Sequence, residues 1–304
     1  MSNPFDSSNP SRRQFLATSA AMAGGAVLTQ TMSATSVMAE DKPKSSKYKK
    51  AVKIGMVQAG NSLMEKFKLL ADLGFDGIEL DSPGGASAEE VQKCIAETGL
   101  KVPGVVDSVH WKDCLSDPSA DVRAKGVAAL EEALKMAKAY GGTSCLLVPG
   151  KCTKEVSFDQ AFERSVAEIK KVTPLAEKLG IEILIENVWN DFLTDPKEMA
   201  RFIDACESKM VGAHFDIGNT IRYSPSHEWI PILGHRIKKL DIKDFKKGEK
   251  GFGAKLMEGD VDWPKCMREL EKIGYTGWGT AEIQGGGREW LTDVAARMDK
   301  IFAS

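Results

Sequence analysis

The chain has 304 residues and a nearly balanced charge, with 41 lysines and arginines against 43 aspartates and glutamates. Its basic residues are scattered rather than gathered, which argues against a nucleic-acid-binding surface. The six cysteines include no Cys-x-x-Cys pair and are too sparse for a disulfide-bonded scaffold.

The amino terminus predicts export. Residues 11–16 read Ser-Arg-Arg-Gln-Phe-Leu, a twin-arginine pattern, and no charged residue follows before Glu40. The intervening stretch is rich in Ala, Gly, Ser and Thr, which makes it too weakly apolar for a stable membrane span. Small residues at Val37 and Ala39 predict cleavage after Ala39. The alternative is a disordered basic tail in which the arginine pair is accidental.

We therefore expect a twin-arginine signal peptide at residues 1–39, followed by a basic linker at residues 40–50. The twin-arginine export machinery is the expected partner, and the periplasm is the expected location.

Residues 51–304 read as eight strand-then-helix units, which predict a single-domain α/β fold, the (β/α)8 TIM barrel. No Gly-x-Gly-x-x-Gly follows the first strand, which argues against a dinucleotide-binding sheet. Helices such as 121–140 and 158–179 carry apolar stripes opposite charged residues. Cys145 and Cys152 flank the end of one strand, and a pairing between them stays open. The expected strands are 52–58, 77–80, 102–107, 144–148, 181–186, 211–216, 237–242 and 279–283.

Four acidic residues recur at the carboxyl ends of the last four expected strands: Glu186, Asp216, Asp241 and Glu282. Strand ends converge on one face of a barrel, so carboxylates far apart in sequence can meet there. A single such residue is more often a helix cap or a loop carboxylate, but four together indicate a metal site. An all-oxygen ligand set favours Mn²⁺ or Mg²⁺, while Co²⁺ and Zn²⁺ stay compatible.

Five segments carry a resemblance to a known family. They read LGFDGIEL (73–80), PLAEKLGIEILIENVWNDFL (174–193), VGAHFDIGN (211–219), IKKLDIKDFK (237–246) and EIQGGG (282–287). The chain resembles the xylose-isomerase-like TIM barrel superfamily over most of residues 51–300. It is most similar to the L-ribulose/L-xylulose 5-phosphate 3-epimerase and tagatose 3-epimerase branches among its sugar phosphate isomerases and epimerases.

The resemblance implies roles for the acidic residues. In that superfamily the metal is held by a Glu on strand five, an Asp on strand six, a His on strand seven and a Glu on strand eight. The two Glu residues also exchange protons with the substrate. Carried over, Glu186 and Glu282 are the catalytic pair and also metal ligands, and Asp216 is a ligand. Strand seven departs from the pattern, because Asp241 stands where the family has histidine. Aspartate also binds metals, so Asp241 is the expected fourth ligand.

Further candidates surround this cluster. The side-chain alternation of strand six places His214 one layer below Asp216, which favours a supporting hydrogen bond over metal ligation. The alternative, purely structural roles are a helix cap for Glu79, a packed loop aromatic for Trp111 and a turn residue for Asn219. The expected substrate-binding residues are Glu79, His110, Trp111, Asn219 and Lys243.

These features predict a divalent-metal-dependent sugar epimerase or isomerase that transfers a proton next to the carbonyl of a keto-sugar. Export favours a free or oxidised sugar over a sugar phosphate. One alternative is a 3-keto-glycoside lyase or hydratase on the same scaffold, and another is a non-catalytic sugar-binding barrel. The DNA-repair endonucleases of the superfamily use a histidine-rich site, which four histidines and no basic groove do not match. A homo-oligomer is compatible with the sequence.

Overall fold

The computed structural model describes residues 47–248 and 251–304. The expected signal peptide and most of the expected linker lie outside these residues. Among the described residues, none of the helices combines the length and the apolar character that crossing a membrane requires.

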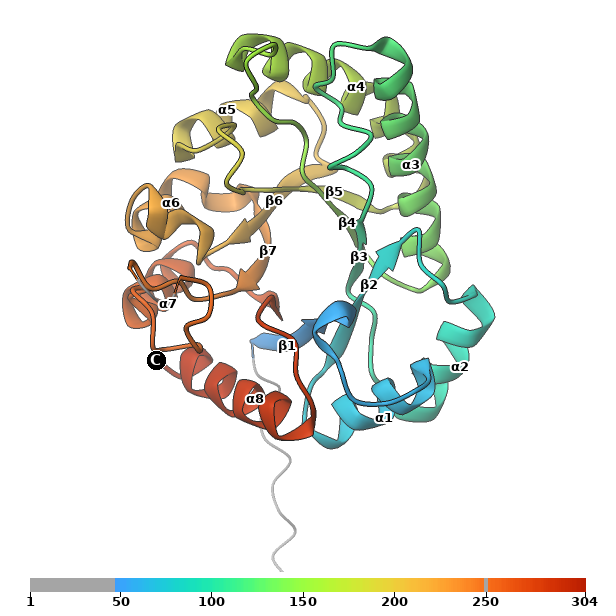
Figure 1. Ribbon diagram of the computed structural model, residues 1–304, viewed down its shortest axis with the longest axis vertical. Helices are drawn as coiled ribbons and strands as arrows, with labels where there is room; N and C mark the ends of the chain where they lie inside the picture. Colours follow the sequence, from blue (N-terminus) through green and yellow to red (C-terminus); the bar gives the residue numbers. More distant parts are fainter. Residues whose placement is uncertain (1–46, 249–250) are drawn as a thin grey trace, which may run out of the picture. The chain divides into compact units, whose positions relative to one another are not determined.

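Eight parallel strands form a closed barrel in sequence order, with β1 hydrogen-bonded to both β2 and β8. Helices surround the barrel on the outside (Figure 1). The predicted TIM barrel is therefore confirmed. The strands are β1 Tyr48–Lys53, β2 Gly77–Ser82, β3 Gly104–Asp107, β4 Ser144–Leu147, β5 Glu182–Glu186, β6 Val211–Asp216, β7 Ile237–Ile242 and β8 Gly277–Ala281.

One main helix follows each strand, and its ends are encoded locally. Ser157 caps α4 in a reciprocal capping box with Gln160, and Gly180 ends the same helix with a φ of 67°. Within the described residues, the connections also contain three short 3₁₀ helices, Ile54–Met56, Asn219–Arg222 and Gly234–Arg236. The main helices are α1 Leu63–Asp72, α2 Ala88–Thr98, α3 Ala120–Ala139, α4 Phe158–Leu179, α5 Pro196–Ala205, α6 Ser226–Leu233, α7 Trp263–Lys272 and α8 Arg288–Phe302.

The apolar core includes strand residues such as Ile183 and Phe215 and helix residues such as Leu70 and Phe202. The barrel interior is polar by contrast. Lys239 of β7 and Glu79 of β2 form a buried ion pair there at 3.3 Å. A Cβ on Gly104 would lie 2.6 Å from the Lys239 ammonium nitrogen, so glycine is required for the lysine to cross the interior.

Several sequence-based strand boundaries need correction. The first strand begins at Tyr48, inside the expected linker, because its ring is buried against Tyr275 and Phe302. The same strand ends at Lys53 instead of residue 58, since a 3₁₀ helix follows at once. Strand β8 ends at Ala281, which places Glu282 just beyond it.

All six cysteines are free thiols, so Cys145 and Cys152 are not paired.

Asp244 organises the long loop between β7 and α7. Its buried carboxylate accepts hydrogen bonds from the backbone N–H groups of Phe245 at 2.9 Å, Met257 at 2.8 Å and Val261 at 3.3 Å. It also accepts one from the Trp263 indole N–H at 3.0 Å. This loop borders the carboxyl end of the barrel, so the carboxylate fixes part of the wall of the site described below.

Replacing Asp244 by alanine is expected to lower the free energy of unfolding by about 3 kcal/mol, because four donors lose a charged acceptor. Asp260 belongs to the same loop, but it is exposed and binds Lys246 and the Lys247 backbone at the surface. Asp260→Ala should therefore cost less than about 1 kcal/mol. Urea unfolding of both variants checks the contrast, and equal losses would show that Asp244 has no special role.

Candidate active site

The structure brings the four predicted acidic residues together at the carboxyl end of the barrel. Asp216 and Asp241 are direct partners in the register of β6 and β7. Glu186 ends β5, and Glu282 follows β8, where its backbone N–H donates to the Ile242 carbonyl. Each offers an oxygen, and these four oxygens lie within 4.8 Å of one another. Both aspartates are fully buried.

Two lysines extend into this cluster and partly neutralise it. The Lys243 ammonium nitrogen lies 2.8 Å from Asp216 Oδ2 and 2.7 Å from Glu282 Oε2. The Lys53 nitrogen lies 2.8 Å from Asp241 Oδ2 and 3.4 Å from Glu282 Oε2. Sequence reasoning missed Lys53. The available signal was a lysine flanked directly by the apolar residues Val52 and Ile54, because a lysine buried among such residues requires an anionic partner.

The residues present fit a divalent cation. With all four carboxylates ionised and both lysines protonated, the cluster has a formal charge of −2, which one divalent cation balances. The donor atoms of the cluster are all carboxylate oxygens, which suit Mn²⁺ or Mg²⁺. The nearby Glu79 and Lys239 compensate each other and leave this balance unchanged.

The pKa values of the two glutamates shift in opposite directions. Burial is the main cause that raises the pKa of Glu186 well above its usual range, and the neighbouring Glu282 and Asp241 add to it. Burial also acts to raise the pKa of Glu282, but the lysines beside it outweigh this effect and lower that pKa. In the protein alone, Glu186 therefore keeps its proton to a higher pH than Glu282 does. Burial raises the pKa of Asp216 to about 7.

A cavity of about 450 Å³ opens above the cluster. Four of the predicted substrate-binding residues line it, namely His110, Trp111, Asn219 and Lys243, and the exposed Trp111 ring stands at its edge. Its wall also includes Lys53, Glu186 and Glu282, together with Trp189 and Phe252. The geometry thus places both candidate acid–base residues at one cavity.

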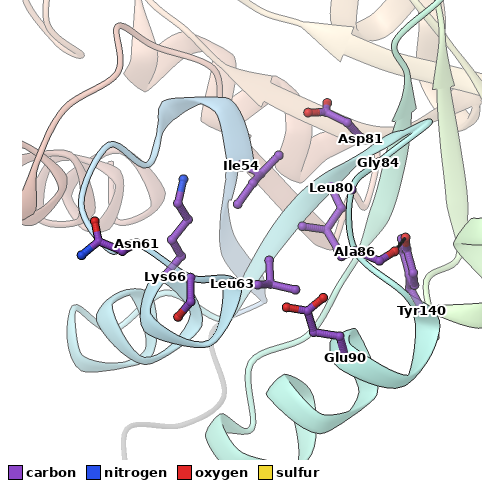
Figure 2. A pocket seen from close by; sticks show the side chains of 12 residues that line it. Ile54, Asn61, Leu63, Lys66, Leu80, Asp81, Gly84, Ala86, Glu90 and Tyr140 are labelled. Atoms are coloured by element: carbon purple, nitrogen blue, oxygen red, sulfur yellow. Dashed lines mark hydrogen bonds between the residues drawn. The ribbon is translucent and has the colours of Figure 1, made fainter.

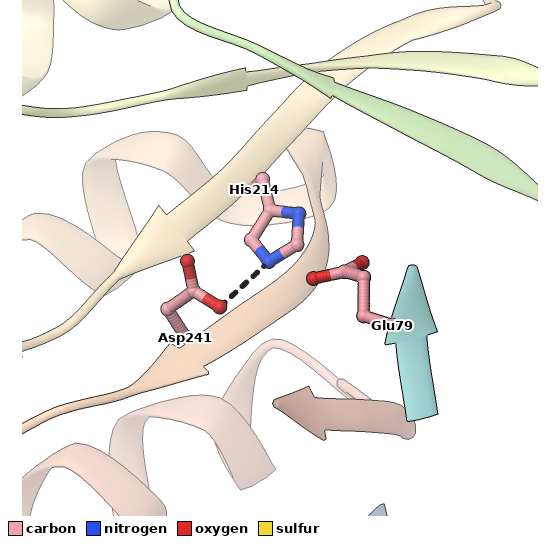
Figure 3. A group of neighbouring side chains, drawn as sticks. All are labelled: Glu79, His214 and Asp241. Carbon is pink, nitrogen blue, oxygen red and sulfur yellow. Dashed lines mark hydrogen bonds and ion pairs between the residues drawn. The ribbon is translucent and has the colours of Figure 1, made fainter. Parts of the chain in front are cut away.

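Glu79 does not belong to this wall, contrary to the sequence-based expectation. Strand β2 continues to Ser82, so Glu79 lies three residues below its end and is 1% exposed. Figure 3 shows its carboxylate facing His214 and Asp241 inside the barrel. Asp81, two residues further along the same face, lines the cavity instead. His214 is fully buried, and its Nε2 lies within hydrogen-bonding distance of Asp241 Oδ1, at 3.0 Å.

A second cavity of about 340 Å³ lies beside the first, between the ends of β1 and β2 and the starts of α1 and α2. Figure 2 shows its wall, which includes Asn61, Lys66 and Glu90. Asp81 lines both cavities. The two spaces are therefore neighbours, with one carboxylate at their boundary.

Comparison with known proteins agrees with this geometry. The profile of the family described as xylose isomerase-like TIM barrel matches residues 67–301. The chain belongs to this family. A curated relative is the L-ribulose-5-phosphate 3-epimerase UlaE of Salmonella typhi, 25% identical over 80% of this chain and 92% of that protein.

Solved structures of the same fold include two further epimerases. The D-allulose 3-epimerase of Methylomonas sp. superposes with a TM-score of 0.70 at 18% identity, over 84% of this chain and 97% of that one. The 3-keto-D-glucoside 4-epimerase YcjR of E. coli gives a TM-score of 0.68 at 17% identity, over 85% and 99%. At these identities the likeness establishes the fold of the family in this chain.

His110 offers the cavity a neutral imidazole. Its Nδ1 accepts a hydrogen bond from the Val148 backbone N–H at 3.4 Å, which leaves the proton of the neutral ring on Nε2. Burial, and then the nearby Lys53 charge, lowers the pKa of His110 to about 4. His110 is therefore a hydrogen-bond donor rather than a cation at neutral pH.

We expect NMR of ring-labelled protein to show His110 as the Nε2–H tautomer with a titration midpoint near pH 4. An unfolded histidine takes up its proton near pH 6.5, so His110 costs the fold stability as the pH falls from about 6.5 to 4. His110→Asn assigns the resonance and should reduce this acid-dependent loss. A midpoint near 6.5 or the Nδ1–H tautomer would contradict the assignment.

Proposed function

We propose that this enzyme epimerises or isomerises a keto-sugar by moving a proton on the carbon next to the carbonyl, with a divalent cation at the carboxylate cluster. The observation that carries the proposal is that Glu186, at the end of β5, and Glu282, just after β8, line one cavity and belong to a carboxylate cluster suited to a cation. The curated relatives of this family member, named as sugar epimerases, support the isomerase class.

The sequence predicts four metal ligands, namely Glu186, Asp216, Asp241 and Glu282, and the structure brings their carboxylates together. A divalent cation bound there supplies Lewis-acid polarisation of a substrate carbonyl. Mn²⁺ and Mg²⁺ suit the carboxylate donors, and Co²⁺ and Zn²⁺ stay compatible. Metal analysis of the purified protein identifies the ion.

The chain's own residues perform the proton transfer. One glutamate removes the proton from the carbon next to the carbonyl, and the other returns a proton to the opposite face, which inverts that centre. The Lys243 ammonium nitrogen forms an ion pair with Glu282 Oε2 at 2.7 Å and so orients the carboxylate. Asn219 in turn accepts a hydrogen bond from Lys243 at 3.4 Å. The apolar rings of Trp111 and Phe252 line the same cavity and limit access of water.

The proposed substrate is a free or oxidised sugar, because the twin-arginine pattern predicts export to the periplasm.

A 3-keto-glycoside lyase or hydratase activity is the second candidate function. It requires the same proton removal, after which the glycosidic C–O bond breaks, a C=C bond forms in the sugar ring, and the substituent takes up a proton and leaves as an alcohol. The neighbouring cavity that shares Asp81 supports this candidate, since it offers room for such a substituent. Product analysis separates the two, because epimerisation leaves the elemental composition of the sugar unchanged, whereas elimination splits it.

Glu186→Gln and Glu282→Gln should each reduce solvent-proton exchange into the substrate by about 10² or more, because each removes a base while preserving shape. NMR in D₂O over keto-sugars such as D-fructose and L-ribulose, and over a 3-keto-glucoside, measures the exchange. Glu182→Gln is the matched control, since Glu182 lies at the opposite end of β5 from Glu186. Full exchange in both active-site variants would remove the two glutamates from the acid–base roles.

The export proposal is tested by replacing Arg12 and Arg13 with lysine, which keeps the charge. Full-length protein should then accumulate in the cytoplasm, because the twin-arginine route reads the arginine pair itself. The matched control replaces Lys42 and Lys44 with arginine, which should leave export intact. Fractionation followed by immunoblotting measures both. Undiminished periplasmic protein from the Arg12 and Arg13 variant would rule out this route.

A further inference from the structure

Lys53 is a buried cation beside the two glutamates of the proposed proton transfer. It ends β1, is 8% exposed, and lines the cavity that contains Glu186 and Glu282. Its ammonium nitrogen lies 2.8 Å from Asp241 and 3.4 Å from Glu282. An ammonium group has three N–H donors, and the ion pairs of the described residues use two. A third donor therefore remains for a ligand in the cavity.

Asp241 is placed to hold this lysine. Its Oδ2 contacts Lys53, and its Oδ1 is 3.0 Å from Nε2 of the fully buried His214 (Figure 3). The three side chains form a connected series from the barrel interior to the cavity. A buried lysine requires an anionic partner, which a histidine at position 241 could not provide. The lysine on β1 thus gives a physical reason for aspartate on β7.

We propose that Lys53 is a substrate-binding residue that donates a hydrogen bond to the substrate's carbonyl oxygen, on the carbon next to the one that loses its proton. Asp241 positions Lys53 instead of ligating the metal. This assignment rests on the proposed function. When the neighbouring carbon loses its proton to a glutamate, negative charge develops on that oxygen, and a fixed ammonium group stabilises it. Glu186, Asp216 and Glu282 then hold the cation.

The contacts of Asp216 make it the matched comparison. Asp216 pairs with Lys243 at 2.8 Å, just as Asp241 pairs with Lys53 at 2.8 Å, and both aspartates are fully buried. Each pair can be replaced by neutral residues of similar size without changing the net charge of the site. Such replacement of a whole buried pair is tolerated better than loss of one partner.

The first experiment measures Mn²⁺ affinity by calorimetry of metal-stripped protein and requires no substrate. The double variant Lys53→Met with Asp241→Asn should bind Mn²⁺ within about threefold of wild type, because no ligand is lost. The double variant Lys243→Met with Asp216→Asn should bind at least tenfold more weakly. Circular dichroism confirms that both fold. Equal losses in the two variants would make Asp241 a ligand and overturn the assignment.

The second experiment measures proton exchange into keto-sugars in D₂O. Lys53→Met should reduce exchange about 10²-fold to 10³-fold, as expected for loss of one donor to a developing oxyanion. Asp241→Asn should reduce exchange too, but it should cause no further loss once Lys53 is methionine. Exchange within threefold of wild type in Lys53→Met would overturn the role of Lys53.

The two experiments separate this assignment from the proposed function. Absence of Mn²⁺ binding by wild type would overturn the proposed cation and the assignment together. If wild type binds Mn²⁺ but exchanges no proton with any keto-sugar, the proposed function fails. The comparison of the two double variants then decides the role of Asp241.

Discussion

The structure depends on how buried carboxylates are compensated at the carboxyl end of the barrel. Asp216 and Asp241 are fully buried and adjacent in the sheet, and Glu186 and Glu282 stand beside them. Burying so many like charges is costly unless cations approach closely. Lys53 and Lys243 supply part of that compensation, and a charge of −2 is left for a divalent cation. The features that make the site suitable for catalysis are those that make it expensive to fold.

The layer below the cluster shows the same principle without a remaining charge. Glu79 and Lys239 pair across the barrel interior, and Gly104 leaves the space that the lysine occupies. Burial lowers the pKa of Lys239, while Glu79 opposes that effect. His214 lies in this layer and reaches the cluster through Asp241. The polar interior therefore links the base of the barrel to its reactive end.

The sequence predicted the barrel and the four acidic positions because each depends on local pattern. A strand that ends in a carboxylate, or a helix that ends in a glycine such as Gly180, can be recognised within a single strand–helix unit. The sequence did not reveal how far along the barrel axis a side chain lies, or which side chains pair across the barrel. Glu79 was placed at the site because β2 was expected to end at Leu80, whereas it continues to Ser82. Lys53 was overlooked because its partners lie 188 residues and more along the chain.

The most direct test of the central claim is a crystal structure of the protein grown with Mn²⁺, with anomalous diffraction used to locate the ion. The account predicts a single strong peak at the cluster, contacting the carboxylates of Glu186, Asp216 and Glu282, while Asp241 stays bonded to Lys53. An anomalous map with no peak among these carboxylates at saturating Mn²⁺ would contradict it.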